Sequence, residues 1–120
     1  MRFLSMIRVD EESGQKPSEQ VRENMGRLMD ELTRAGVLID TAGLAPTSEG
    51  VRMHLARGGR ITVTDGPFAE TKEVIGGYAI FEVASKDEAV ALTRRFLEAH
   101  GEDWDIECEL RPMMAPGECG

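Results

Sequence analysis

The stretch 74–100, VIGGYAIFEVASKDEAVALTRRFLEAH, predicts a long β-strand followed by an amphipathic helix. Apolar residues lie on both faces of the strand expected over 74–83, which indicates an interior position in a sheet. Ser85 and Glu88 have the spacing of a capping box, so the helix should begin here, and His100-Gly101 should end it. Its inner stripe recurs at helical spacing and comprises Ala89, Leu92, Thr93, Phe96 and Leu97.

The N-terminal part of the chain has the same strand-then-helix pattern. Residues 2–9 are apolar on both faces, which is typical of a second interior strand. Ser18 can cap a helix whose apolar residues recur at helical spacing, and Gly36 is a natural stop. Residues 37–42 then read as another strand.

Two further segments flank the opening stretch. Residues 51–56 and 61–64 are β-prone and enclose the turn Arg57-Gly58-Gly59-Arg60, which predicts a hairpin because glycine accepts a positive φ. Charged and apolar residues alternate toward the C-terminus, and this indicates a half-buried last strand that contains Trp104, Ile106, Cys108 and Leu110.

The order is strand, helix, strand, hairpin, strand, helix, strand. With the hairpin set aside as an insertion, it becomes β-α-β-β-α-β, the ferredoxin-like α+β arrangement, with both helices on one face of an antiparallel sheet. We expect one domain over residues 1–112 and a loosely ordered tail over 113–120. The other sheet face would stay open, so we expect a symmetric homodimer that covers it, with space for a small-molecule ligand.

Composition narrows the class of partner. The chain has 120 residues and a net charge of −8, which disfavours nucleic-acid binding. No apolar run approaches the ~20 residues that a membrane span needs, and the N-terminal apolar segment is too short for a signal peptide. Two cysteines form neither a disulfide framework nor a zinc site, so we expect a reduced, cytoplasmic setting and no metal or other cofactor.

Polar residues concentrate between the hairpin and the strand over 74–83, in residues 65–73, here called the signature loop. The residues Asp65-Gly66-Pro67 are typical of a turn, and Phe68 can anchor the loop in the core. One interpretation is therefore a rigid structural connection. In the other interpretation the loop borders a pocket, with Asp65 as a general base or ligand acceptor.

Four more residues belong to the same hypothesis. Glu70 and Lys72 would share a face of an extended segment, where Lys72 could hold an anion or enolate, or the two could form a solvated pair. Gly76-Gly77 indicates a bulge or the close approach of a backbone or ligand. Tyr78 is the only tyrosine and is either a hydrogen-bond donor to substrate or a core ring.

The segment Thr64-Asp65-Gly66-Pro67-Phe68-Ala69-Glu70-Thr71-Lys72-Glu73, with Gly76-Gly77-Tyr78 after it, resembles the signature of the YCII-related family, in its DGPF branch. The resemblance continues through Ala35-Gly36-Val37-Leu38 and Gly43-Leu44-Ala45-Pro46. It implies a dimeric α/β barrel of the ferredoxin-like superfamily, whose function is mostly uncharacterised. It also implies an association with alternative sigma factors in this branch.

Short YCII proteins carry a histidine on the first helix, proposed to form an acid/base dyad with an aspartate. The corresponding position here is Met25, which cannot transfer a proton, so the dyad does not carry over.

Three hypotheses for function remain. The first is a small-molecule enzyme of proton-transfer or lyase type without a redox cofactor. It would use Asp65 as base, Lys72 as anion stabiliser and Tyr78 as donor, with Gly66, Pro67, Phe68, Glu70, Gly76 and Gly77 around the ligand. The alternative is a non-catalytic ligand-binding or regulatory module linked to a sigma factor. The third is a dimer whose signature loop only stabilises the fold.

Overall fold

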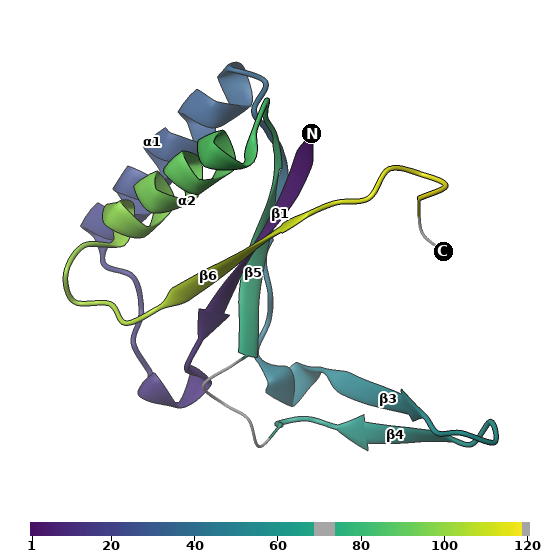
Figure 1. The fold of residues 1–120 in the computed structure, drawn as a ribbon. Helices are drawn as coiled ribbons and strands as arrows, with labels where there is room; N and C mark the ends of the chain where they lie inside the picture. Colours follow the sequence, from purple (N-terminus) through teal and green to yellow (C-terminus); the bar gives the residue numbers. More distant parts are fainter. Residues whose placement is uncertain (69–73, 119–120) are drawn as a thin grey trace.

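The computed structural model describes residues 1–68 and 74–118, which form a helix-covered sheet and a projecting hairpin (Figure 1). Short 3-10 turns at Glu11–Ser13 and Thr47–Glu49 interrupt the connections. Along the chain, the strands and helices are β1 (Arg2–Val9), α1 (Glu19–Arg34), β2 (Leu38–Gly43), β3 (Val51–Leu55), β4 (Ile61–Asp65), β5 (Val74–Glu82), α2 (Lys86–His100) and β6 (Glu107–Pro112).

The main sheet has the order β2-β5-β1-β6, and every neighbouring pair is antiparallel. This order confirms the predicted ferredoxin-like α+β fold. The two strands expected to be interior, β1 and β5, occupy the two central positions. Both helices cover the same face, as Figure 1 shows, which leaves the opposite face open.

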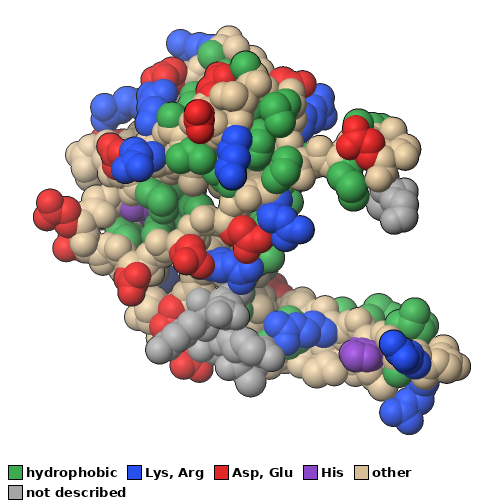
Figure 2. All heavy atoms as spheres, viewed as in Figure 1, with side chains coloured by type: hydrophobic (Ala, Val, Ile, Leu, Met, Phe, Trp, Pro, Cys, Tyr) green, Lys and Arg blue, Asp and Glu red, His purple; other side chains and the backbone are tan. Residues whose placement is uncertain are grey.

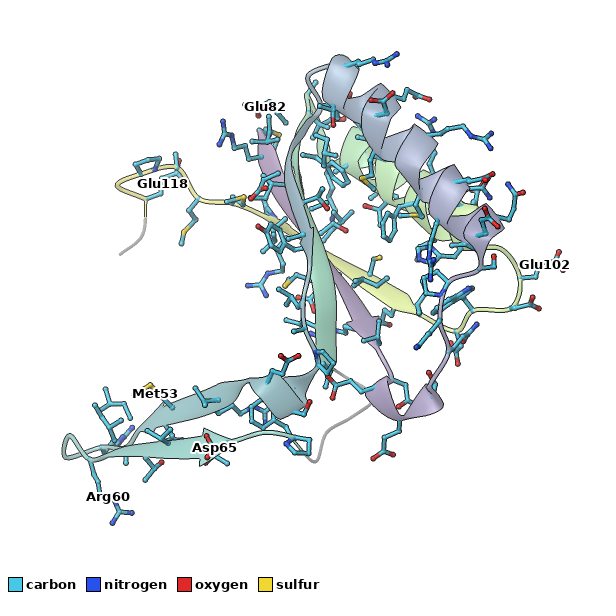
Figure 3. All side chains as sticks on the ribbon, turned by 180° about the vertical axis from the view of Figure 1, so that it is seen from behind. Met53, Arg60, Asp65, Glu82, Glu102 and Glu118 are labelled. Atoms are coloured by element: carbon cyan, nitrogen blue, oxygen red, sulfur yellow. The ribbon has the colours of Figure 1, made fainter. Side chains whose placement is uncertain are left out.

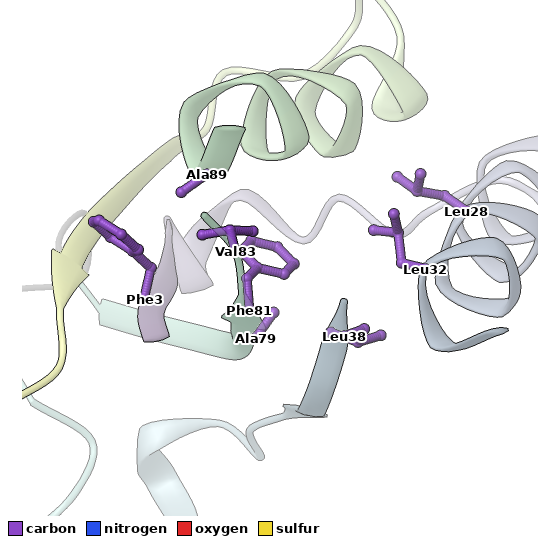
Figure 4. Close-up of a cluster of buried hydrophobic side chains, with 8 residues drawn as sticks. All are labelled: Phe3, Leu28, Leu32, Leu38, Ala79, Phe81, Val83 and Ala89. Carbon is purple, nitrogen blue, oxygen red and sulfur yellow. The ribbon is translucent and has the colours of Figure 1, made fainter. Parts of the chain in front are cut away.

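The core lies between the helices and the central strands. Phe3 of β1 and Phe81 of β5 are directly opposite each other and are the two largest fully buried side chains. Leu28 and Leu32 of α1 reach the same layer, as does Ala89 of α2 (Figure 4). Burial of such apolar side chains contributes about 1.5–3 kcal/mol each.

Helix ends follow the capping chemistry expected from the sequence. The Ser18 Oγ accepts a hydrogen bond from the Val21 amide at 3.2 Å, and Ser85 does the same for Glu88 at 3.2 Å. The Glu88 carboxylate accepts the Ala84 amide at 3.0 Å, one residue before the cap. After α1, Gly36 takes φ of 74°, the left-handed conformation that ends the helix.

The predicted hairpin is present but forms its own two-stranded sheet, β3 with β4. We call residues 51–65 the arm. Gly58 and Gly59 at its tip have φ of 98° and 94°, which explains the glycine pair. The arm projects from the body on the side of the open sheet face (Figure 1).

The last strand is shorter than predicted, because β6 begins at Glu107 and leaves Trp104 in the preceding loop. The indole packs edge-on against the His100 ring, with centroids 5.5 Å apart. His100 in turn lies 5.0 Å from the Phe96 ring. Alternation alone predicted a strand here, but this aromatic stack at the end of α2 holds Trp104 outside the sheet.

Candidate ligand cavity

A cavity of about 260 Å³ lies between the two helices and the main sheet. Its volume is close to the lower end of small-molecule sites. The sheet supplies most of its wall and the helices supply three side chains. The lining residues are Ser5, Ile7, Met25, Met29, Thr41, Ala42, Gly43, Gly76, Gly77, Tyr78, Ala79, Phe81, Phe96 and Cys108.

The wall is mainly apolar. Met25 and Met29 of α1 and Phe96 of α2 face the strands across it. Methionine side chains adapt to the shape of a ligand because they are unbranched and polarizable. The cavity therefore suits a largely apolar molecule.

Three side chains give the wall a limited polar content. Thr41 donates its hydroxyl to the Tyr78 carbonyl at 2.8 Å. Burial raises the pKa of the Cys108 thiol, an effect that a hydrogen bond with Ser5 partly offsets. The thiol is therefore predominantly protonated near neutral pH, and these groups offer neutral hydrogen bonds to a ligand.

Gly76 and Gly77 line the cavity and explain the predicted irregularity. The register of β1 with β5 shifts between Ile7 and Arg8, which skips Gly76 as a bulge. A Cβ on Gly76 would lie 2.8 Å from a Val9 methyl, and one on Gly77 would lie 3.0 Å from the Ala42 carbonyl oxygen. Close approach of neighbouring strands thus favours glycine at these two positions.

Tyr78 is among the residues that line the cavity, but its ring points away from it. Successive residues of a strand face opposite sides of the sheet, and because Ala79 and Phe81 point toward the helices, the Tyr78 ring lies on the open face. The hydroxyl donates to Asp40 Oδ2 at 2.8 Å. This hydrogen bond raises the pKa of Tyr78, with smaller contributions from desolvation and from the Asp40 charge. Asp40 was not singled out from the sequence, because its partner lies 38 residues away.

Asp65 ends β4 on the arm and is exposed, and it does not line the cavity (Figure 3). Gly66, Pro67 and Phe68 follow it and do not line the cavity either. Glu70 and Lys72 fall outside the described residues. The structure therefore brings Gly76, Gly77 and Tyr78 to the cavity and places the described part of the signature loop elsewhere.

Residues 66 and 68 of the signature loop are bonded to the base of the arm. The Gly66 amide donates to the Gly50 carbonyl at 2.9 Å, and the Phe68 amide donates to the Thr47 hydroxyl at 3.3 Å. The Arg52 guanidinium stacks 4.0 Å above the Phe68 ring. A cation over an aromatic face at this distance is attractive by about 0.5–2 kcal/mol.

Glu11 completes this anchor. Its carboxylate accepts the Thr47 amide at 2.6 Å and the Thr47 hydroxyl at 2.6 Å. Charge-assisted pairs of this length are about twice as strong as neutral hydrogen bonds. Nothing in the sequence distinguishes Glu11 beyond its place in a polar loop, since the contact joins segments 36 residues apart.

Three further ionisable side chains do not line the cavity. His54 is exposed on β3, and the His100 ring nitrogen Nδ1 lies 3.0 Å from the Phe96 carbonyl. Glu109 pairs with Arg8 at 2.8 Å across the open sheet face. Within residues 1–68 and 74–118, no group of three or more His, Cys, Asp or Glu side chains is arranged to hold a metal ion.

No helix in the described part of the chain is both long and apolar enough to cross a membrane. Fold and cavity together define an α+β protein of ferredoxin-like topology with a small cavity between helices and sheet. The YCII-related domain matches residues 1–100, so the chain belongs to the YCII-related family. It is also similar to an uncharacterised protein of Rhizobium meliloti (strain 1021), with 33% identity over 100 residues that cover 83% of this chain and 80% of that protein.

Proposed function

We propose that this protein is a non-catalytic small-molecule-binding module whose ligand occupies the cavity between helices and sheet. The observation that carries the proposal is the chemistry of the wall. Among the described residues that line it there is no carboxylate, histidine, lysine or arginine. The expected ligand is a neutral, largely apolar molecule, such as an aromatic compound, with room for a hydrogen bond to Ser5, Thr41 or Cys108.

Proton-transfer chemistry has less support. Met25, at the position where short YCII proteins carry a histidine, lines the cavity and cannot act as a base. Asp65, the base of the enzyme hypothesis, is exposed on the arm. A general base must lie within hydrogen-bond reach of the proton that it removes, either directly or through one water.

The proposal also covers the family branch of this protein, its partners and its compartment. The Asp65-Gly66-Pro67-Phe68 motif supports membership of the DGPF branch, with a sigma factor as a candidate protein partner. The open sheet face, with half-buried Leu4, Met6 and Ile80, supports a homodimer. A half-buried free thiol at Cys108 suits a reducing, cytoplasmic compartment.

Binding of indole, a neutral bicyclic aromatic probe, tests the assignment. We expect micromolar to millimolar affinity by calorimetry, together with slower alkylation of Cys108 by iodoacetamide, since Cys108 lines the cavity. Met25→Trp should fill the space and abolish both effects. Arg27→Trp places the same side chain on an exposed position of α1 and should leave them unchanged.

The competing enzyme hypothesis predicts a different pattern. If the signature loop forms the site, Asp65→Asn would weaken indole binding and Met25→Trp would not. That result, or the absence of indole binding to a folded wild-type protein, would overturn the cavity assignment.

A further inference from the structure

Two methionines stand side by side in the wall of the cavity. Met25 and Met29 lie one turn apart on α1, and both line the cavity. Residues four positions apart on a helix share a face, with about 5–6 Å between their Cβ atoms. The two thioether side chains are therefore neighbours on one apolar surface, and a chemical change in both would alter that side of the wall.

Both side chains are accessible to solvent. Met25 and Met29 are half-buried, whereas Leu28 between them is only 7% exposed. The helices lie on the sheet face opposite to the open one, so a homodimer formed through the open face would leave α1 accessible (Figure 1). In Figure 2, charged side chains of both signs cover much of the helix-bearing part of the body, as is typical of a surface in water. A small oxidant dissolved in water can therefore reach the two sulfur atoms.

The third sulfur atom of the cavity wall is less reactive. It belongs to Cys108, and burial raises the pKa of this thiol. The thiolate, which is the form that reacts with peroxides, is therefore scarce near neutral pH. A thioether has no proton to lose, so its oxidation needs no such ionisation. The methionine pair is thus the expected first site of oxidation in the cavity.

Oxidation would change what the wall can bind. Each methionine sulfoxide adds a polar oxygen, which accepts hydrogen bonds but cannot donate them. The hydroxyl groups of the wall already have partners. Thr41 donates to the Tyr78 carbonyl oxygen, and Tyr78 donates to Asp40. Ser5 is hydrogen-bonded to Cys108. A sulfoxide in the cavity would therefore lack a donor or bring water with it, and either outcome weakens the binding of an apolar ligand.

We propose that Met25 and Met29 form a reversible oxidation site that weakens ligand binding in the cavity. This proposal rests on the proposed function, because it concerns regulation of the same site. Hydrogen peroxide transfers one oxygen atom to each thioether: the O–O bond breaks, an S–O bond forms, the sulfur loses two electrons, and the peroxide is reduced to water. A methionine sulfoxide reductase reverses the step with a dithiol, which becomes a disulfide as water is released.

Calorimetry with indole, before and after treatment with hydrogen peroxide, tests the oxidation site. Mass spectrometry of tryptic peptides shows which methionines have gained oxygen. Oxidation of both Met25 and Met29 should weaken indole binding at least about tenfold. Methionine sulfoxide reductases should restore the affinity. Dithiothreitol alone should not restore it, because it reverses the sulfenic acid and disulfide forms of cysteine but not methionine sulfoxide.

Matched variants assign the effect to the cavity. Met25→Leu/Met29→Leu keeps an apolar wall of similar volume, and its own affinity for indole should not change after peroxide treatment. Met53→Leu/Met113→Leu/Met114→Leu replaces three exposed methionines that do not line the cavity, and it should lose affinity as the wild type does. Circular dichroism should show the same helix content before and after oxidation in each protein.

The possible results separate this proposal from the proposed function. Absence of indole binding to the untreated wild type would overturn both. Unchanged binding when Met25 and Met29 are oxidised would overturn the oxidation site and leave the ligand cavity in place, as would a loss of binding that persists in Met25→Leu/Met29→Leu. A loss of helical circular dichroism on oxidation would also overturn it, because damage to the fold would then explain the lower affinity.

Discussion

A side chain at Gly66 would collide with the backbone of a neighbouring segment. A Cβ there would overlap the Thr47 carbonyl oxygen and lie 2.6 Å from the carbonyl carbon. The Gly66 amide is also bonded to the Gly50 carbonyl, so the loop cannot move away without breaking that contact. The glycine of the signature motif thus allows close packing at the junction between the arm and the body.

Gly66→Ala should therefore destabilise the protein by about 1–3 kcal/mol or more, the usual effect of forced overpacking. Urea unfolding followed by circular dichroism measures the change. Gly26→Ala is the control, because Gly26 lies within α1 and a Cβ added there would meet nothing within 4 Å. That substitution should stabilise by about 0.5–1 kcal/mol through helix propensity. Equal stability of Gly66→Ala and wild type would contradict the steric account.

Thr47 joins three segments through one side chain. Its hydroxyl donates to Glu11 at 2.6 Å and accepts from the Phe68 amide at 3.3 Å. Thr47→Val keeps the shape and removes both contacts, so we expect a loss of about 1–3 kcal/mol in unfolding free energy. Ser48→Ala, at an exposed neighbour, should change it by less than about 0.5 kcal/mol. If both variants unfold alike, the two hydrogen bonds of the Thr47 hydroxyl do not stabilise the fold.

At the scale of elements, the start of α1 depends on one hydroxyl. Ser18 accepts the Val21 amide, which otherwise has no intrahelical partner. Ser18→Ala should cost about 1 kcal/mol, and Ser18→Gly only a few tenths, because glycine leaves the amide open to water. Thermal unfolding of the two variants side by side measures the difference. A larger effect of glycine would indicate that backbone flexibility, not capping, dominates at this end.

At the scale of the whole molecule, ion pairs connect elements that the sequence separates. Arg95 of α2 holds the pKa of Glu31 on α1 below its ordinary value, mainly through a hydrogen bond at 2.7 Å. Hydrogen bonds from Arg8, and then Arg111, lower the pKa of Glu109 on β6 in the same way. Both pairs are solvent-accessible, so each contributes modestly.

These shifts set the direction of the pH dependence. Because the folded-state pKa of Glu31 lies below 4.5, its ordinary value, the pair stabilises the fold above that pH. The contribution is lost as the pH falls through the folded-state pKa. The urea midpoint of Glu31→Gln should therefore lie below that of wild type near neutral pH and converge with it in acid. Glu98→Gln, on an exposed position of α2, should follow wild type throughout. A constant gap for Glu31→Gln would contradict this linkage.

Most of the fold follows from local signals. Periodicity located both helices and the central strands, and Ser18, Ser85 and Gly36 defined helix ends, because a cap involves residues only a few positions apart. The glycine pair at 58–59 predicted the hairpin turn for the same reason. Trp104 was assigned to a strand wrongly, because alternation cannot detect a ring stacked on a helix end.

The sequence by itself thus determined the ferredoxin-like order, the core faces and the turn of the arm, since each depends on neighbours in the chain. Only the tertiary structure assembled the cavity from four strands and two helices, joined Glu11 to Thr47, and separated the arm from the main sheet. Those features depend on strand register and on packing between segments that are far apart in the chain. A local pattern of side chains does not indicate which distant segments come into contact.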